Sequence, residues 1–118
     1  MGRYQDVRVV ENITLADLLH KYLEQISTTK RSNSERRDRD SAKAILARLG
    51  KDILLKEVNT RRLAEYRDVR IKEVSPSTIQ KEFALLSHLF NIARREWGLP
   101  VGNPVKDVTR PKIANNRT

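Results

Sequence analysis

Residues 74–99 read VSPSTIQKEFALLSHLFNIARREWGL, and this pattern predicts one long amphipathic helix. Ser75 precedes a proline, which disfavours helical dihedrals at Ser75 and suits it to cap the helix, while Pro76 fits the first helical turn. Gly98 and Pro100 would end the helix. The apolar side chains recur at helical spacing, and they are Ile79, Phe83, Leu86, Phe90, Ala93 and Trp97. About 22 residues at about 1.5 Å each make a rod about 33 Å long.

Three shorter helices are predicted upstream of this one. They cover residues 15–26, where Thr14 and Asp17 can form a capping box, residues 34–49, and residues 60–73. The polar segment 27–34 is predicted to be a loop. The side chains expected to face inward are Leu15, Leu18, Leu19, Tyr22 and Ile26 in the first helix, Ala42, Ile45, Leu46 and Leu49 in the second, and Leu63, Tyr66 and Val69 in the third.

The two ends of the chain lack such a period. Residues 1–12 are polar and are interpreted as a tail or the remnant of a preceding segment. Beyond Pro104, residues 105–118 are basic and featureless, which predicts a linker. With no strand pattern in between, the sequence predicts an all-α fold: one compact four-helix domain over residues 13–104.

The charge of the chain points to a polyanionic partner. Lysine and arginine number 24 against 15 aspartates and glutamates, giving a formal net charge of +9. Each cation placed on a phosphate releases a condensed counterion, so a basic protein of this kind favours nucleic acid. A basic protein with no nucleic-acid role is the alternative. The excess is concentrated in Lys30, Arg31, Arg36, Arg37, Arg39, Lys43 and Arg48, and again near the end of the chain.

Several other classes of function find no support in the sequence. It contains no cysteine and only two separate histidines, so no metal site is expected. It has no glycine-rich phosphate loop and no nucleophile beside a base, so no cofactor, small-molecule ligand or catalytic site is expected. No apolar run approaches the roughly 18 residues of a membrane span, which predicts a soluble protein in a reducing compartment.

The outward side of the long helix could bind DNA. It presents Ser77, Gln80, Lys81, Ala84, His88, Asn91 and Arg95, with no carboxylate among them. Ala84 permits close approach to a groove, and Gln80 and Asn91 could contact base edges. The first-turn N–H groups, with Ser77 and Thr78, could hold a phosphate. An ordinary solvated helix face is the alternative, and His88 alone is more often a surface residue than a ligand.

The segments described above, in this order, resemble the core-binding domain of phage-type tyrosine recombinases. Residues 74–99 followed by Asn103-Pro104 carry most of the resemblance. The opening Thr14-Leu15, the Leu49-Gly50 pair and the YRDVR segment at 66–70 add to it, and the whole resemblance covers about residues 13–112.

The resemblance implies a SAM-like four-helix bundle that, with a C-terminal catalytic domain, closes around DNA as a C-shaped clamp. Helices matching the second and fourth here lie across the major groove of the core recombination site. Together with the charge clusters, this predicts one set of DNA-binding residues: Lys30, Arg31, Arg36, Arg37, Arg39, Lys43, Ser77, Thr78, Gln80, Lys81, His88, Asn91 and Arg95. For the arginine-rich helix, an ordinary charged face with local pairs such as Arg36–Asp40 is the alternative.

The family's chemistry needs an arginine, a lysine, a His-x-x-Arg element and a nucleophilic tyrosine. Neither His20 nor His88 is followed by an arginine at the third position, so the chain itself is not expected to be an enzyme. We expect the DNA-binding domain of a site-specific integrase, acting on double-stranded DNA with other integrase protomers in the bacterial cytoplasm, at the nucleoid. The alternatives are a helical protein-interaction module with a basic face and, least favoured, a complete enzyme.

Overall fold

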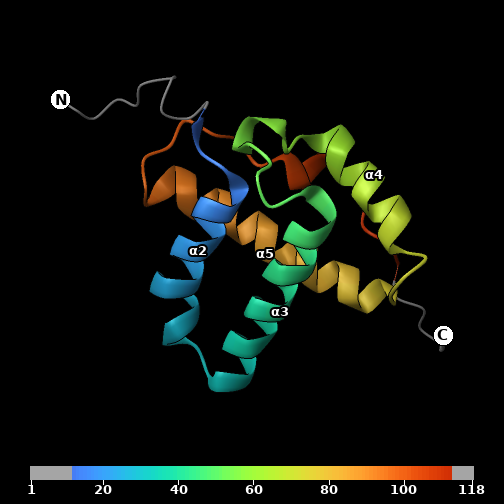
Figure 1. The fold of residues 1–118 in the computed structure, drawn as a ribbon, viewed down its shortest axis with the longest axis horizontal. Helices are drawn as coiled ribbons and strands as arrows, with labels where there is room; N and C mark the ends of the chain where they lie inside the picture. Colours follow the sequence, from blue (N-terminus) through green and yellow to red (C-terminus); the bar gives the residue numbers. More distant parts are fainter. Residues whose placement is uncertain (1–11, 113–118) are drawn as a thin grey trace.

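The computed structural model describes residues 12–112, and these residues form an all-α fold, as the sequence predicted (Figure 1). The helices are α2 (Leu15–Gln25), α3 (Ser32–Leu49), α4 (Thr60–Arg70) and α5 (Pro76–Arg95). Three short 3-10 helices lie between and after them: η1 (Ser27–Thr29), η2 (Leu55–Glu57) and η3 (Pro104–Asp107). Within this part of the chain no helix is long and apolar enough to cross a membrane.

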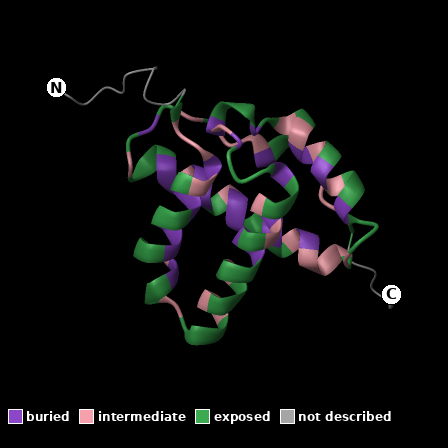
Figure 2. Ribbon diagram, in the orientation of Figure 1, coloured by how far each residue is buried: buried purple, intermediate pink, exposed green. Residues whose placement is uncertain are grey.

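The central element is α5. In Figure 1, α2 and α3 form an antiparallel pair joined through η1, and α5 passes behind both of them. The predicted apolar stripe is confirmed as core within α5, where Ile79, Phe83 and Leu86 are fully buried. Its last member, Trp97, follows the end of the helix and is only partly buried. Figure 2 shows buried positions along α5. The buried face is wider than the stripe and also includes Leu85 and Leu89, because α2, α3 and η3 cover α5 from several sides. Burial of this many large apolar side chains on one helix is what positions it in the fold.

The starts predicted for α2, α4 and α5 are confirmed. The Thr14 hydroxyl accepts from the Asp17 N–H at 3.0 Å while the Asp17 carboxylate accepts from the Thr14 N–H, a complete capping box. Asn59 and Ser75 cap α4 and α5 through their side chains. At the end of α3, Gly50 has a φ of 106°, a region that L side chains rarely adopt.

The inward face of α4 differs from the prediction at one position. Val69, expected to face inward, is 56% exposed, and α4 ends at Arg70 rather than near Glu73. The buried residue is Arg70 instead, which is 7% exposed. Positions 69 and 70 both suit the spacing from Tyr66, and the acid on α5 that pairs with Arg70 decides between them.

Two segments expected to be irregular are ordered and packed. The polar loop 27–34 contains η1, and α3 begins at Ser32 instead of Ser34. The predicted linker over residues 105–118 lies within the described residues only as far as residue 112, and this part is not featureless. It contributes to η3, which lies against α4 and α5, and it buries Val105 and Val108. These two valines are three residues apart, the spacing of one face of a 3-10 helix. A single turn of this kind is too short to be recognised from the sequence.

Candidate nucleic-acid interface

The outward row of α5 faces away from the core, as its spacing predicted. Lys81, Ala84, His88 and Arg95 are exposed, and Ser77, Gln80 and Asn91 are partly exposed. The acid nearest this row in sequence, Glu82, points the other way and is buried. The exposed part of α5 therefore carries cations and neutral hydrogen-bonding groups until Glu96, the residue that follows the helix.

A pocket of about 260 Å³ lies beside this row, where α5 meets α2 and α3. It brings together four residues that were predicted to bind DNA from separate parts of the sequence. They are Lys30, Arg37, Lys81 and His88. The remaining lining residues are Tyr22, Asp38, Ser41, Ala84 and Leu85. Three cations against one carboxylate make this hollow a site suited to an anion.

A chain of hydrogen bonds runs along one wall of the pocket. The Asp38 carboxylate accepts from the Lys30 ammonium at 2.8 Å and from the Ser27 hydroxyl at 2.8 Å. Lys30 also donates to the Tyr22 hydroxyl at 3.2 Å, and that hydroxyl lies 2.7 Å from Nδ1 of His88. Because Tyr22 is 1% exposed and Ser27 is fully buried, these bonds hold the wall in one arrangement.

The same contacts set the charge of the groups in the pocket. Burial lowers the pKa of His88, the positive charges of Lys30 and Arg95 lower it further, and Asp38 opposes them. Burial alone would also lower the pKa of Lys30, but its hydrogen bonds to Asp38 and Tyr22 outweigh burial and raise it. At neutral pH the pocket therefore contains a charged Lys30 and a neutral His88.

The other cations predicted on α3 and at its N-cap lie outside this pocket. Arg31, Arg36 and Lys43 are exposed and line no part of it. Arg39 forms a salt bridge with Glu35 at 2.9 Å, four residues before it on the same helix. Of the α3 cluster, Arg37 is thus the cation that the helix crossing places next to α5.

The first turn of α5 has fewer free backbone N–H groups than the first turn of a helix usually has. Pro76 has no N–H, and the Thr78 N–H is already bonded to Ser75 through its hydroxyl and its carbonyl oxygen. Among the described residues this leaves the Ser77 N–H, together with the Ser77 and Thr78 side chains, for a phosphate.

The segment after α5 is fastened to the opposite edge of the outward row. The Gln80 amide donates to the Pro111 carbonyl at 2.9 Å, and the Asn103 amide donates to Asn91 Oδ1 at 3.2 Å. Arg67 of α4 donates to the Thr109 carbonyl at 2.9 Å. The two amide residues predicted to contact base edges therefore each make one protein contact in this structure.

Comparison with known proteins assigns the chain to a family. Residues 11–112 match the family model described as phage integrase, N-terminal domain. The chain belongs to this family. The integrase N-terminal domain is 36% identical over 118 residues to the shufflon-specific DNA recombinase of Escherichia coli, covering 92% of this chain. It is 36% identical over 121 residues to a Haemophilus influenzae protein named "Putative integrase/recombinase", covering 99% of this chain. No solved structure gives a significant match.

In both comparisons the integrase N-terminal domain spans 30% of the relative's length. The match to the family model and the identity to these two relatives confirm the family resemblance inferred from the sequence. The described residues also contain no group of three or more histidine, cysteine, aspartate or glutamate side chains that could hold a metal ion.

One polar cluster of this integrase domain escaped the sequence analysis. Glu82 is 1% exposed, and it accepts from the Arg70 guanidinium at 2.8 Å and from the Tyr66 hydroxyl. Glu73 bonds both Arg70, at 3.1 Å, and Arg48, at 2.7 Å, so the cluster joins α3, α4 and α5. The signal was present, since Glu82 lies between apolar residues of the stripe and a buried acid requires a cation.

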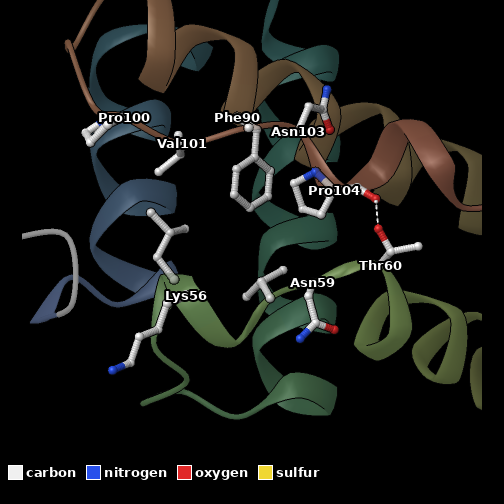
Figure 3. Close-up of a pocket in the computed structure, with 11 residues that line it drawn as sticks. Lys56, Asn59, Thr60, Phe90, Pro100, Val101, Asn103 and Pro104 are labelled. Carbon is white, nitrogen blue, oxygen red and sulfur yellow. Dashed lines mark hydrogen bonds between the residues drawn. The ribbon is translucent and has the colours of Figure 1, made fainter. Parts of the chain in front are cut away.

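A second pocket lies on the other side of α5 (Figure 3). It measures about 410 Å³ and is lined mainly by apolar and amide groups, including Phe90, Val101 and Pro104. The Thr60 hydroxyl donates to the Pro104 carbonyl at 3.1 Å across one edge of it. Lys56 is its only charged lining residue, so this pocket offers neither the cations of the first pocket nor a paired acid and base.

Proposed function

We propose that this domain binds double-stranded DNA at the core recombination site of a site-specific integrase, and so serves DNA integration and recombination. The observation that carries the proposal is that residues of the outward row of α5 also line the basic pocket beside it. Cations from three parts of the chain, Lys30, Arg37 and Lys81, meet there, and no carboxylate lies on the row itself.

In this proposal the contacts divide into two kinds. Lys30, Arg37, Lys81 and Arg95 supply positive charge for backbone phosphates, which gives affinity and salt dependence. The exposed methyl group of Ala84 lets α5 approach a groove closely. Gln80 and Asn91, at the edge that faces the C-terminal segment, contact bases with the hydrogen-bonding capacity that their bonds to Pro111 and Asn103 leave open.

Strand cleavage and joining are not assigned to this chain. The chain spans 30% of the length of its relatives, and its sequence contains no His-x-x-Arg element. Tyr22 and Tyr66 are buried and hydrogen bonded to other side chains. We therefore propose that the chemistry resides in another domain of the integrase, to which residues 105–118 form the connection.

Other integrase protomers on the same DNA are the second proposed partner. Val69 and Ile71, at the end of α4, are the exposed large apolar residues of the described chain, at 56% and 40%. Neither residue lines the basic pocket between α2, α3 and α5, so a protein contact there and DNA at that pocket are compatible. Such an assembly would act in the bacterial cytoplasm, at the nucleoid.

Binding to a random-sequence DNA duplex over a series of salt concentrations tests the proposal. If about five phosphates are neutralised, the logarithm of the binding constant should fall against the logarithm of salt with a slope near −4.5. A response that is independent of salt, or no binding at low salt, would contradict DNA binding and favour the protein-interaction module.

A further inference from the structure

The hydrogen-bond chain in the pocket determines where His88 carries its proton. The Lys30 ammonium can only donate, so at 3.2 Å the Tyr22 oxygen accepts from it. The Asp38 carboxylate holds the Lys30 ammonium in place, and the Ser27 hydroxyl holds that carboxylate by donating to it. The single O–H of Tyr22 is then available to the nearest acceptor, Nδ1 of His88, which lies 2.7 Å away.

A neutral imidazole that accepts at Nδ1 must carry its hydrogen on Nε2. The His88 ring stands nearly perpendicular to the Tyr22 ring, at 80° with centroids 5.5 Å apart, and this edge contact helps to orient the His88 ring. Within residues 12–112 the structure records no protein partner for Nε2, and His88 is exposed. The Nε2–H group is therefore an oriented donor that can bond an acceptor on a ligand.

We propose that the pocket between α2, α3 and α5 seats one phosphate of the DNA backbone, and that His88 donates its Nε2–H to an oxygen of that phosphate. The inference rests on the proposed DNA-binding function and names the contact made at one site within it. Arg37 and Lys81 supply the charge on the two sides of the seat, while Ala84 and Leu85 contribute its uncharged lining. The Asp38 carboxylate is already paired with Lys30.

A phosphate fits this seat better than a base edge does. Base edges carry partial charges, whereas the lining has three cations of which Lys30 alone is paired with an acid of the pocket. The groups that face His88 are Tyr22 of α2, Lys30 at the end of η1, Arg37 and Asp38 of α3, and Lys81 and Arg95 of α5. Burial, aided by the positive charges of Lys30 and Arg95, lowers the pKa of His88. His88 is therefore neutral in the free protein at neutral pH, and its Nε2–H gives the contact its direction.

The first arm of the test needs no DNA. Long-range ¹H–¹⁵N spectra of the free chain at about pH 7.5 distinguish the two neutral tautomers of each histidine. We expect His88 in the Nε2–H form, and we expect Tyr22→Phe, which removes the O–H and keeps the ring, to mix its tautomers without moving His20. An Nδ1–H form in the unaltered chain, or no response to Tyr22→Phe, would overturn the tautomer assignment.

The second arm measures binding to several random-sequence duplexes. His88→Ala, which removes the donor, should weaken binding about tenfold on every duplex, and His88→Gln, whose amide can place an N–H near the same point, should stay within about threefold of the unaltered chain. His20→Ala, a change on the exposed surface of α2, should have no effect.

The outcomes separate this inference from the proposed function. If the unaltered chain binds DNA and His88→Ala binds equally well, the phosphate seat is wrong and DNA binding stands. A loss confined to one duplex sequence would assign Nε2–H to a base and overturn the phosphate assignment. If the unaltered chain binds no DNA, the proposed function and this inference both fail.

Discussion

Arg70 Nη2 lies 2.8 Å from Glu82 Oε2, and the two side chains are only 8% and 1% exposed. The hydrogen bond that Arg70 donates to Glu82 raises the pKa of Arg70 above its already high usual value. Burial, followed by the bond to Glu82, likewise raises the pKa of Tyr66. The pair connects the end of α4 to the first half of α5, the half that carries Ser77, Gln80 and Lys81.

Removing the cation of this pair should destabilise the fold strongly. Arg70→Met leaves the Glu82 charge buried without its main partner, and we expect the free energy of unfolding to fall by about 3–5 kcal/mol in chemical denaturation. The double variant Arg70→Met, Glu82→Leu removes both charges and should recover most of the loss. A matched change at an exposed pair, Arg61→Met beside Glu65, should cost less than about 0.5 kcal/mol. Equal costs for Arg70→Met and Arg61→Met would show that the buried pair is not what joins the helices.

The bond from Gln80 to Pro111 should restrain the C-terminal segment with little effect on global stability. Gln80→Ala removes one neutral hydrogen bond, so the free energy of unfolding should change by no more than about 1.5 kcal/mol. The ¹⁵N order parameter of the Arg110 amide should fall from a rigid value near 0.85 toward about 0.6. Ser77→Ala, on the same helix and without a bond to this segment, is the control. An unchanged order parameter would mean that the bond does not hold the segment.

The lowered pKa of His88 predicts a specific dependence of stability on pH. The unfolded chain has the ordinary histidine pKa of 6.5 and binds the proton more readily than the folded chain does. The contribution of His88 is thus fully present above pH 6.5 and is lost as the pH falls through the folded pKa. In thermal unfolding, the unaltered chain should lose more stability than His88→Gln on going from about pH 7.5 to about pH 5. Parallel curves for the two proteins would contradict the lowered pKa.

Two arginines on α3 provide a test of the pocket itself. Arg37 lines it, whereas Arg39 is paired with Glu35 and lies outside it. Arg37→Glu and Arg39→Glu change the net charge equally. We expect Arg37→Glu to weaken DNA binding by about tenfold more, measured by fluorescence anisotropy at one salt concentration. If both variants lose the same affinity, the binding surface extends over α3 without regard to the pocket.

The parts of the fold that were predictable from the sequence are those set by local chemistry. Thr14, Ser75 and Gly50 mark helix ends because a cap or a positive φ depends on neighbouring residues alone. The choice between Val69 and Arg70 could not be made this way, because it depends on an acid twelve residues after Arg70 that tertiary packing brings to α4. Val105 and Val108 were missed for a similar reason, since a single 3-10 turn has too few residues to show a period.

The candidate interface likewise has a part that the sequence predicted and a part that depends on tertiary packing. The outward row of α5 follows from the period of one helix, and its exposure agrees with the prediction. Which cations of residues 30–43 join it depends on how α3 crosses α5, and no pattern within α3 distinguishes Arg37 from Arg36. The bond from Tyr22 to His88 spans 66 residues and was likewise beyond the reach of spacing arguments.

The comparison of Lys81→Glu with Lys56→Glu tests the central claim most directly. Lys81 lines the pocket beside the outward row, while Lys56 lines the apolar pocket around Phe90 on the other side of α5, and both residues are exposed. The two variants have the same net charge and should each unfold within about 0.5 kcal/mol of the unaltered chain. Binding to a random duplex should weaken for Lys81→Glu, with a salt slope shallower by about one unit, and should change little for Lys56→Glu. Equal losses of affinity in the two variants would show that net charge, and not this face of α5, binds the DNA.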